Sequence, residues 1–419
     1  MRIAVIGAGI IGITTAYELA VDGHEVTVFE RRGAAAEETS FANAGVVAPG
    51  SVTPWAAPGM PGKVLGNLLS RHAAIKLSLP LSGNDLAWMW KWWRACKLET
   101  YLANRARLHR LAFYSQSRLH QLTADLQLDY DRAEGYTVLL RSEKDSRLVQ
   151  PGLQILRDAG VAFSEINAEG VRKIEPAINP DTEFLGGIHM PNDEVANCRQ
   201  FALLLKDKAR DLGVKFEFNT TVDQLNTAQA ASVLIAGENT PRQFDRIVMC
   251  AGLASAALLK PLGLKIPMAA VYGYSISAPI REALNAPRSA LMDERYKVAI
   301  SRLGNRVRVA GSAEIGGSLA KHRASSIQTL YKVLHDWFPG AAQNANTGSS
   351  VQVWKGARPM LPDAPPIIGE SGLAGLWLNL GHGSSGWALS CGSARALTDL
   401  MAGKAAEVNM EGLSVARLN

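Results

Sequence analysis

Cysteine is scarce in this sequence, and long apolar runs are absent from it. No apolar stretch reaches the roughly 20 residues that are needed to cross a bilayer, so any membrane contact is expected to be peripheral. The cysteines are spread along the 419 residues without a CxxC pair, a spacing that predicts neither a disulfide framework nor a zinc site. We therefore expect no bound metal and a reducing compartment. The four cysteines are Cys96, Cys198, Cys250 and Cys391.

Concentrated charge, internal repeats and low-complexity tracts are also lacking. The net charge is +6 and the pI is near 9.1, but no run of Lys or Arg gathers that charge in one place. A mild excess of this kind is mostly a solubility property and is compatible with an anionic membrane surface. The sequence passes directly from Met1 into an apolar strand, a start unlike that of a signal peptide. We expect a cytoplasmic protein without a nucleic acid partner; a peripheral position on the cytoplasmic face of the inner membrane is an alternative.

The N-terminal segment contains a glycine pattern that is typical of dinucleotide binding. Residues 3–6 predict a buried parallel strand, which leads into the turn Gly7-Ala8-Gly9-Ile10-Ile11-Gly12 and then a helix. The first glycine permits the tight turn, the second lets the backbone approach a pyrophosphate, and the third lets the helix pack closely on the sheet. A bare glycine pattern is weak evidence, but this one has the strand-turn-helix context that the motif requires.

The segment after the helix supplies an acidic residue at the expected distance. Residues 25–30 predict a second strand, which ends at Glu30, eighteen residues after Gly12. A carboxylate there accepts hydrogen bonds from both hydroxyls of an adenosine ribose. Arg31 and Arg32 would suit the 2′-phosphate of NADP, but the charge of Glu30 would repel a phosphate. The pattern therefore favours a dinucleotide without that phosphate; a turn without any ligand is the alternative.

Two later segments predict more of the same architecture. Residues 200–212 read as a helix, and residues 214–218 and 246–250 as strands, so the nucleotide domain resumes after an insertion. Near the C-terminus, residues 376–380 predict a strand, followed by a glycine-rich turn and a helix to about residue 401. Such a turn directs backbone N–H groups and the positive end of the helix at one point, where an anion or an electron-rich ligand atom is stabilised.

A tryptophan-rich helix is predicted to start after Ser82. Asp85 follows Ser82 at the spacing of a capping box, and the helical pattern continues to about residue 128. Trp88 and Trp92 fall on a different face from the apolar stripe, and they could enter a membrane interface; packing in a core or at a subunit contact is the alternative. The apolar stripe comprises Leu86, Met89, Trp90 and Trp93.

Several segments, distributed from end to end, together resemble D-amino acid dehydrogenases of the small, single-subunit type, which belong to the D-amino acid oxidase and glycine oxidase superfamily of FAD proteins. The segments are Glu38-Thr39-Ser40 with Asn43-Ala44-Gly45, Pro54-Trp55-Ala56-Ala57-Pro58-Gly59, Pro191-Asn192-Asp193-Glu194, Gly273-Tyr274-Ser275, Ala313-Glu314-Ile315, Gly356-Ala357-Arg358-Pro359-Met360 and Gly381-His382-Gly383.

The resemblance implies an α/β fold, with a Rossmann-like FAD-binding domain and an inserted α+β substrate domain built on a mixed sheet. The FAD-binding domain is expected to be discontinuous, at 1–80, 191–262 and 350–419, with the substrate domain at 81–190 and 263–349. The resemblance also implies oxidative deamination of D-amino acids such as D-alanine to 2-oxo acids and ammonia. Hydride would pass from the substrate Cα to flavin N5, and the electrons would go on to a quinone or another carrier.

The candidate catalytic residues follow from the chemistry of this substrate. A carboxylate is bound well by a planar double donor, and Arg358 in a Gly-Ala-Arg-Pro turn is the best candidate; a surface arginine is the alternative. Tyr274 is a second candidate for the same carboxylate, with a core tyrosine as the alternative. His382 lies next to the C-terminal glycine turn and is either close to the flavin or a packing residue. Asp293 and Glu314 are candidates for the substrate amine, although exposed charges are the favoured interpretation.

The residues expected to bind FAD come from the glycine turns and from the matching segments. Because the turn at Arg358-Pro359-Met360 has no cysteine, where sarcosine-type amine oxidases attach their flavin, we expect the FAD to be non-covalent. The expected cofactor-binding residues are Ile6, Gly7, Ala8, Gly9, Ile10, Ile11, Gly12, Glu30, Arg31, Ser40, Asn43, Ala44, Gly45, Val222, Ala251, Gly252, Gly356, Gly381, Gly383, Ser384, Ser385 and Gly386.

Other functions are compatible with the same sequence features. A dehydrogenase for D-proline or hydroxy-D-proline, or a glycine or sarcosine oxidase, would share the chemistry and differ in pocket side chains. An FAD-carrying subunit of a multi-subunit amine dehydrogenase would need a partner for catalysis. An NAD-dependent dehydrogenase is the weakest alternative, since it would leave the C-terminal glycine turn without a role. The preferred substrate, the electron acceptor and the oligomeric state do not follow from the sequence.

Overall fold

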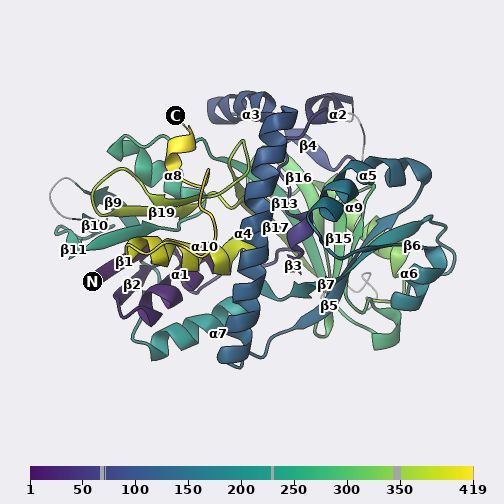
Figure 1. Cartoon of the computed structure of the whole chain (residues 1–419), viewed down its shortest axis with the longest axis horizontal. Helices are drawn as coiled ribbons and strands as arrows, with labels where there is room; N and C mark the ends of the chain where they lie inside the picture. Colours follow the sequence, from purple (N-terminus) through teal and green to yellow (C-terminus); the bar gives the residue numbers. More distant parts are fainter. Residues whose placement is uncertain (67–69, 71, 228–230, 343–350, 419) are drawn as a thin grey trace.

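The computed structural model describes residues 1–66, 70, 72–227, 231–342 and 351–418. Its strands form two large sheets that lie side by side, with the long helix α4 (Leu98–Asp125) running between the two halves of the molecule (Figure 1). Both chain termini lie in the half that contains the smaller of these sheets (Figure 1). This mixed α/β architecture confirms the predicted fold class.

The six-stranded sheet is the nucleotide-binding half that the N-terminal pattern predicts. Its strand order is β18-β19-β12-β1-β2-β8, and every pair is parallel except β18 with β19. Each of the central strands β1, β2, β12 and β19 is almost wholly buried, as expected for strands covered on both faces. The strands are β1 (Arg2–Ile6), β2 (Glu25–Phe29), β8 (Lys215–Glu217), β12 (Arg246–Met249), β18 (Ile367–Glu370) and β19 (Leu376–Leu380).

A layer of helices covers one face of this sheet, and a small three-stranded sheet covers the other. Helices α1 (Ile10–Val21), α7 (Cys198–Asp211) and α10 (Gly386–Met401) share one core with the middle of α4. The second core joins the opposite face to the three-stranded sheet and to α8 (Ala254–Leu259). The small sheet has the order β11-β10-β9 and comprises β9 (Val222–Asn226), β10 (Ala231–Ile235) and β11 (Arg242–Phe244).

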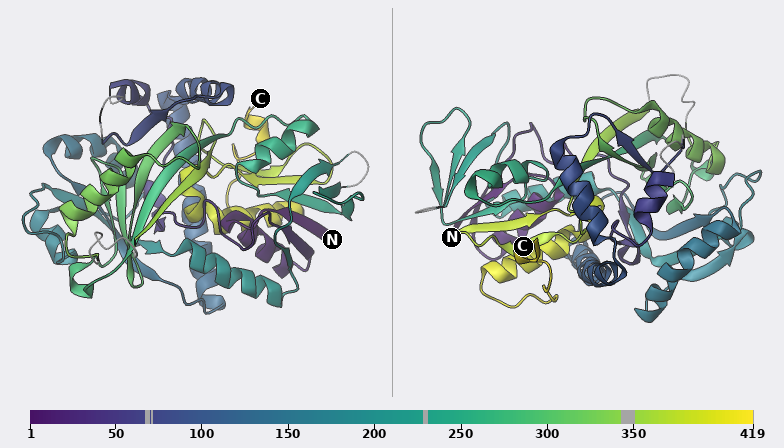
Figure 2. Two further views of the ribbon diagram at one scale, coloured as in Figure 1. Left: turned by 180° about the vertical axis from the view of Figure 1, so that it is seen from behind. Right: turned by 90° about the horizontal axis from the view of Figure 1, so that it is seen from above.

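The ten-stranded mixed sheet forms the other half of the molecule. Its main path is β17-β13-β16-β15-β14-β5-β7-β3, with β4 pairing to β16 and β6 to β7. Helix α9 (Ala324–Trp337) packs on one face, as the view from behind shows (Figure 2). The strands are β3 (Val46–Val47), β4 (Ile75–Ser78), β5 (Arg132–Leu140), β6 (Ser164–Asn167), β7 (Gly186–Ala196), β13 (Ala269–Pro279), β14 (Ala290–Asp293), β15 (Val298–Leu303), β16 (Arg306–Gly316) and β17 (Gln352–Met360).

The division into domains stays a prediction, because the predicted boundaries cross these elements. Strands β3, β4 and β17 belong to the ten-stranded sheet, although the ranges predicted for the FAD-binding domain include them. The predicted boundary at residue 191 falls inside the continuous strand β7. Helix α4 lies in a range predicted for the substrate domain, yet its buried side chains share the core of the nucleotide-binding half.

The tryptophan-rich segment forms two helices, where the pattern predicts one. Helix α3 (Gly83–Ala95) starts with the predicted capping box between Ser82 and Asp85, and a break at residues 96–97 separates it from α4. Trp88 and Trp92 are buried and stacked, with ring centroids 6.4 Å apart, and the Trp88 indole donates to the Met360 carbonyl oxygen. The packing alternative is therefore correct for these two residues, and they do not enter a membrane interface. Helices α2 (Met60–Gly66), α5 (Glu143–Asp158) and α6 (Ala168–Ile174) complete the main elements.

Candidate active site

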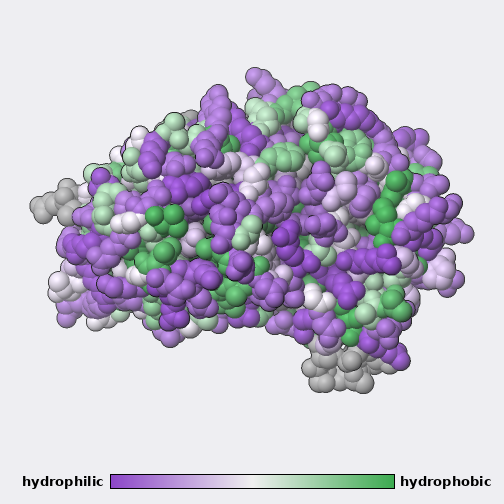
Figure 3. Space-filling model, turned by 60° about the horizontal axis from the view of Figure 1, so that its bottom comes forward, coloured by the Kyte–Doolittle hydropathy of each residue, from purple (hydrophilic) through white to green (hydrophobic). Residues whose placement is uncertain are grey.

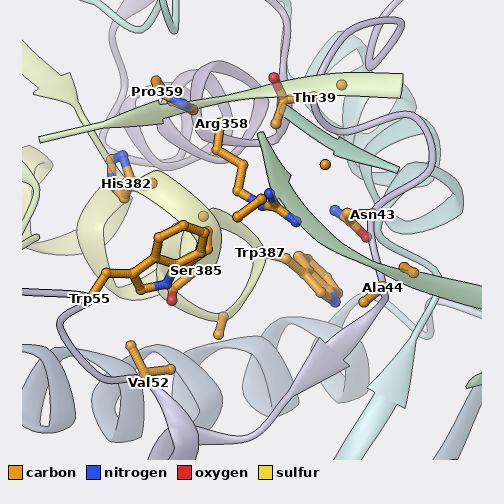
Figure 4. Close-up of a pocket in the computed structure, with 18 of the residues that line it drawn as sticks. Thr39, Asn43, Ala44, Val52, Trp55, Arg358, Pro359, His382, Ser385 and Trp387 are labelled. Carbon is orange, nitrogen blue, oxygen red and sulfur yellow. The ribbon is translucent and has the colours of Figure 1, made fainter. Parts of the chain in front are cut away.

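A cavity of about 2210 Å³ lies between the two large sheets, and both sheets line it. A drug-sized ligand typically occupies roughly 300–1,000 Å³, so this cavity has room for a dinucleotide and a substrate together. Figure 4 shows side chains from the loop after β2, from β17 and from the turn before α10 around one open centre. The glycine turn after β1 and strand β17 both line the cavity.

The three glycines of the N-terminal turn have different structural roles. Gly7 has φ +103°, and an added Cβ there would lie 2.8 Å from the Cys250 carbonyl oxygen. A Cβ at Gly12 would lie 1.8 Å from the Gly7 carbonyl oxygen, so the close approach of α1 to the turn requires glycine. Gly9 is different, because its added Cβ would meet only the Ser40 hydroxyl, at 3.5 Å, and Gly9 lines the cavity. The protein therefore leaves space at Gly9, which agrees with the predicted approach to a pyrophosphate.

Two helices begin at the cavity, with their N-terminal ends toward it. Helix α1 has Gly9 as its N-cap, and the Ser40 hydroxyl accepts its first N–H, that of Ile10. Helix α10 has Ser385 as its N-cap, whose side chain accepts no hydrogen bond from the helix. Neither helix has an acidic residue in its first turn. The first residues of both helices line the cavity, so two positive helix ends are directed at it. This arrangement suits a ligand with anionic groups at two separate points.

Glu30 lies at the end of β2, where the sequence predicts a ribose-binding carboxylate. Its two oxygens accept backbone N–H groups of Ala8 and Arg32, each at 2.8 Å, and the residue lines the cavity. These bonds fix the carboxylate and leave further lone pairs for ribose hydroxyls. Arg31 and Arg32 both pair with Glu38, so this carboxylate already partners the two arginines that would suit a 2′-phosphate.

The loop at residues 40–45 is tied to both halves of the molecule. The Ser40 hydroxyl accepts the Ile10 N–H at 3.0 Å, which joins the loop to the start of α1. The Ala44 carbonyl accepts the Ser301 hydroxyl at 2.8 Å, and the buried Arg308 donates to the Asn43 carbonyl at 3.0 Å. These contacts hold the loop as a wall of the cavity.

Arg358 presents a cation to the cavity without a carboxylate partner among the described residues. Its Nη1 donates to the Ser312 carbonyl at 3.0 Å, and its guanidinium carbon lies 5.7 Å from the centre of the Trp55 ring. The guanidinium lies over Gly273, where an added Cβ would be 2.3–2.8 Å from three of its atoms. Burial lowers the pKa of Arg358 to about 10, so the group stays charged at neutral pH. The side chain extends from β17 toward the open centre in Figure 4.

Tyr274 lies on the opposite face of the sheet from Arg358. In the ladder between β13 and β17, Arg358 pairs with Val271 and Tyr274 pairs with Lys355, and successive side chains alternate between faces. Tyr274 packs in the core beneath α9, its hydroxyl donates to Glu314, and it accepts the Arg323 N–H at 3.0 Å. Tyr274 is therefore a core tyrosine, the alternative given above. Its side chain is not placed to bind the same substrate carboxylate as Arg358.

His382 lines the cavity as a buried, neutral side chain. Its Nε2 lies 3.1 Å from the Ser393 hydroxyl of α10, and burial lowers its pKa to about 3. The residue fixes the turn before α10 to the helix, and its backbone also bridges to Met360. A neutral imidazole with this pKa does not act as a proton donor near neutral pH.

Asp293 and Glu314 are buried, so the interpretation of both as exposed charges is wrong. Asp293 accepts hydrogen bonds from Arg141 at 2.8 Å and from the Trp337 indole at 2.7 Å. Glu314 pairs with the buried Lys355 at 2.8 Å and also accepts the hydroxyl of Ser78. Neither carboxylate lines the cavity, so neither is placed to bind a substrate amine.

Most of the predicted cofactor residues line the cavity. The exceptions are Ala8, whose side chain is fully buried, and Gly12, which packs against Gly7. The predicted residues that do line it are Ile6, Gly7, Gly9, Ile10, Ile11, Glu30, Arg31, Ser40, Asn43, Ala44, Gly45, Val222, Ala251, Gly252, Gly356, Gly381, Gly383, Ser384, Ser385 and Gly386.

Sequence reasoning missed several lining residues that no local motif identifies. Thr39 donates from its hydroxyl to the Ala357 carbonyl at 2.7 Å, and the Trp55 ring packs beside Arg358. Trp55 stands in the matching Pro-Trp-Ala segment, which was the one available signal for it. Trp387 and Asn379 each line the cavity and each have a buried polar atom without a protein partner, the indole N–H and the amide oxygen.

The residues around the cavity fit FAD. Two helix N-terminal ends, the Glu30 carboxylate at the cavity and the space at Gly9 match a dinucleotide. The unpartnered polar atoms of Trp387 and Asn379 can pair with a further polar ligand group. Among the residues that the structure describes, no group of three side chains could hold a metal ion, and no helix is long and apolar enough to cross a membrane.

Comparisons with known proteins agree with this site. A family model described as FAD dependent oxidoreductase matches residues 2–400. A D-amino acid dehydrogenase of Bradyrhizobium diazoefficiens is 41% identical over 419 residues, which cover 100% of this chain and 99% of that protein. A D-amino acid dehydrogenase of Cereibacter sphaeroides is 41% identical over 421 residues, with coverage of 100% and 95%.

Solved structures show the same fold at low sequence identity. Glycine oxidase from Geobacillus kaustophilus has a TM-score of 0.74 at 19% identity, covering 99% of each chain. Iminodiacetate oxidase from Chelativorans sp. BNC1 has a TM-score of 0.74 at 20% identity, covering 99% of this chain and 98% of its own. The predicted resemblance is confirmed: this chain belongs to the family of FAD-dependent oxidoreductases that includes the D-amino acid dehydrogenases.

Proposed function

We propose that this protein is a D-amino acid dehydrogenase, which converts D-amino acids to 2-oxo acids and ammonia. The observation that carries this proposal is Arg358, a cation directed into the cavity without a carboxylate partner among the described residues. A planar guanidinium of this kind binds a substrate carboxylate through two hydrogen bonds. The names of the two curated relatives support the same reaction.

The residues of the protein position the substrate for oxidation. Arg358 binds the carboxylate, and the Trp55 ring lies beside the guanidinium, 5.7 Å from its carbon to the ring centre. Bound FAD supplies a two-electron acceptor for the hydride that leaves the substrate Cα. The positive end of α10 would stabilise negative charge on a reduced cofactor held beside it. Loss of hydride and of one amine proton gives an imino acid, which water hydrolyses to the 2-oxo acid and ammonia.

None of His382, Asp293 and Glu314 is placed to act as a strong base. His382 is neutral and tied to Ser393, and the buried carboxylates of Asp293 and Glu314 are engaged elsewhere. Hydride transfer needs orientation and an unprotonated amine more than it needs a base. The arrangement therefore suits a substrate that binds as the free amine.

We also propose that the electrons leave to a quinone or another carrier at the cytoplasmic face of the inner membrane. Helix α3 supports a peripheral contact, because its outward face carries Leu86, Trp90 and Trp93, each more than half exposed. Arg94 lies 4.8 Å from the Trp90 ring, and Lys91 is exposed beside it. Exposed tryptophans among basic residues are typical of a helix at a membrane interface.

The surface around α3 also borders the cavity. Leu98, at the start of α4, is 61% exposed and lines the cavity, as do Met60 and Val64 of α2. Helices α2 and α3 lie along the same side of the molecule in both views of Figure 2. The side away from α3 is different, since hydrophilic side chains predominate there and hydrophobic ones lie in separate groups (Figure 3).

Cosedimentation with vesicles tests the membrane contact. The intact protein is expected to bind vesicles that contain anionic lipid and to lose that binding in the double variant Trp90→Ser, Trp93→Ser. The control Trp88→Phe changes a buried tryptophan of the same helix and is expected to leave binding intact. Equal binding by all three proteins, or none by the parent, would show that this surface does not contact lipid.

The visible absorption spectrum under anaerobic conditions tests the reaction. A yellow protein that is bleached by D-alanine and not by L-alanine supports the proposal. Faster bleaching by D-proline would assign a cyclic secondary amine as substrate. A yellow protein that no amino acid bleaches would favour a subunit that needs a partner, and a colourless protein without FAD would count against the whole assignment.

A further inference from the structure

Arg105 of α4 is a second cation that lines the cavity, and only 4% of its surface is exposed. Its Nη2 donates to the Gly152 carbonyl of α5 at 3.2 Å, and its Nη1 donates to the Tyr101 hydroxyl at 3.3 Å. Its Nε donates to His109 at 3.3 Å. Burial and the charge of Arg105 lower the pKa of His109 to about 4, so this histidine is neutral near neutral pH. All three partners of the guanidinium are therefore uncharged.

The charge of Arg105 has no carboxylate partner among the residues that the structure describes. Two carboxylates elsewhere in the cavity lining are already engaged, since Asp145 pairs with Arg295 at 3.2 Å and Glu294 pairs with Lys297. A guanidinium has five N–H donors, and the three contacts of Arg105 leave two of them for a ligand. Because a buried charge without a counter-charge is costly, this site favours a ligand with an electron-rich oxygen.

The face of α4 that carries Arg105 leads outward to an apolar rim. Leu98, Tyr101 and Arg105 follow one another at helical spacing, so they share a face, and all three line the cavity. Leu98 is 61% exposed, Tyr101 is partly buried and Arg105 is buried, so this face runs inward over about 10 Å. On α5, Leu148 lies one turn before Gly152, is 51% exposed and also lines the cavity. The site thus has a cationic inner end and an apolar outer end.

The outer end adjoins the surface that we propose to contact lipid. Leu98 begins α4 directly after the break that follows α3. Met60 and Val64 of α2 line the same cavity. Lys144, one turn before Leu148 on α5, is exposed and also lines the cavity, and a cation there suits anionic lipid. An apolar ligand can therefore pass from a membrane surface toward Arg105.

The cavity also connects Arg105 with the proposed substrate position. Helix α4 packs against the short turn at Pro49–Ser51. The chain continues from this turn to Val52 and Trp55, which lie around the same open centre as Arg358 (Figure 4). The two arginines therefore border one cavity, from different elements. A ligand at Arg105 and a substrate at Arg358 can both reach a cofactor that is bound there.

We propose that Arg105 and Tyr101 bind a carbonyl oxygen of a quinone, and that its apolar tail leaves the cavity past Leu98 and Leu148. The inference rests on the proposed function. The Tyr101 hydroxyl accepts from Arg105, so its own O–H is free to donate to the quinone. The cation stabilises the negative charge that the quinone oxygen gains as electrons arrive. The quinone takes two electrons and two protons from the reduced cofactor, forms two O–H bonds and leaves as the quinol.

The thermal shift caused by a quinone tests this site without turnover. Ubiquinone-1 and menadione are the probes, and at least one of them is expected to raise the Tm of the oxidised holoenzyme. Arg105→Gln and the milder variant Tyr101→Phe are expected to lose most of that rise. Tyr114→Phe is the matched control, because Tyr114 is another tyrosine of α4 that has an unpartnered hydroxyl and does not line the cavity. It is expected to keep the whole rise.

The two half-reactions then show which ligand Arg105 serves. Each protein is bleached by D-alanine without oxygen and is then mixed with the quinone. The rate at which the yellow colour returns is expected to fall by about tenfold or more in Arg105→Gln and by less in Tyr101→Phe, because hydrogen bonds to charged groups are the stronger ones. The rate of bleaching by D-alanine, which precedes the quinone, is expected to change little by comparison.

The outcomes separate this inference from the proposed function. If D-alanine bleaches the parent but neither quinone shifts its Tm or restores its colour, the reaction stands and the quinone site is wrong. The site is also wrong if Arg105→Gln behaves like Tyr114→Phe. If Arg105→Gln mainly slows bleaching by D-glutamate, the cation binds a second substrate carboxylate instead. If no D-amino acid bleaches the parent, the proposed function fails, and the thermal shift still decides whether a quinone binds at Arg105.

Discussion

At the scale of single residues, Arg358 is the side chain proposed to bind the substrate carboxylate. Its hydrogen bond to the Ser312 carbonyl fixes the guanidinium and leaves other N–H donors directed at the cavity. A charge-assisted double hydrogen bond is worth about 3 kcal/mol, or roughly 100-fold in binding. Arg358→Ala is therefore expected to lower kcat/KM for D-alanine by about that factor while FAD stays bound.

Arg358→Lys refines this prediction. Lysine keeps the positive charge but loses the planar double donor, so its kcat/KM is expected to lie between those of the parent and the alanine variant. The measurement is steady-state kinetics with a dye acceptor, together with the flavin absorbance of each purified protein. Parent-like kinetics in Arg358→Ala would show that another residue holds the carboxylate.

His382 gives a prediction for stability against pH. Burial lowers its pKa to about 3 in the folded protein, whereas an unfolded histidine has a pKa of about 6.5. Between these values the histidine binds a proton in the unfolded state but not in the folded state, so this residue lowers the free energy of unfolding as pH falls below about 6.5. His382→Gln does not titrate, and its Tm is expected to fall less between about pH 7 and 5. Equal losses of Tm in both proteins would contradict this.

At the scale of elements, local patterns predicted the strands and helices well but not which face of each would be buried. The glycine turn, the capping box at Ser82 and the C-terminal strand-turn-helix all formed as their patterns predict, because each depends on neighbouring residues. Helix α3 buries Trp88 and Trp92 and exposes the predicted stripe around Trp90, since the contact with β13 and Met360 decides which face is covered.

The same limit applies to Tyr274. Its motif suggested a place beside Arg358, but the alternation of side chains along β13 directs it to the other face of the sheet. Conversely, no sequence signature groups Ala310, Ala299 and Met292, because these cavity residues become neighbours only through strand pairing. Long-range register is the information that a single sequence lacks.

The uncapped start of α10 leads to a prediction about the redox potential. Reduced flavin carries negative charge, and an acidic residue at the N-cap would oppose it where the helix end now stabilises it. Ser385→Asp is expected to lower the midpoint potential of the bound FAD relative to Ser385→Asn, a neutral side chain of similar size. A difference of about 1 kcal/mol corresponds to roughly 20 mV for two electrons. Equal potentials, measured by dye equilibration, would place the reduced flavin away from α10.

At the scale of the whole molecule, the cavity joins two sheets that have largely separate cores. A ligand that fills it contacts both halves, and binding to the folded state alone adds about 4 kcal/mol of stability at a thousandfold excess over Kd. Non-covalent FAD should therefore be removable, and the apoprotein should unfold at a lower temperature until FAD is restored. Yellow colour that stays with the protein after denaturation and ultrafiltration would instead show covalent attachment.

The variant Gly9→Val is expected to give a protein without FAD, like the apoprotein described above. Gly9 has φ −71° and ψ 178°, a conformation that valine adopts, and its added Cβ would meet only the Ser40 hydroxyl at 3.5 Å. The variant is therefore expected to fold, to purify colourless, and to show the Tm of the apoprotein without a response to added FAD. Gly12→Ala is the contrasting variant, since its Cβ would lie 1.8 Å from the Gly7 carbonyl oxygen and would disrupt the turn itself. A yellow Gly9→Val protein would mean that the pyrophosphate does not pass over this turn, and the nucleotide end of the cavity would have to be reassigned.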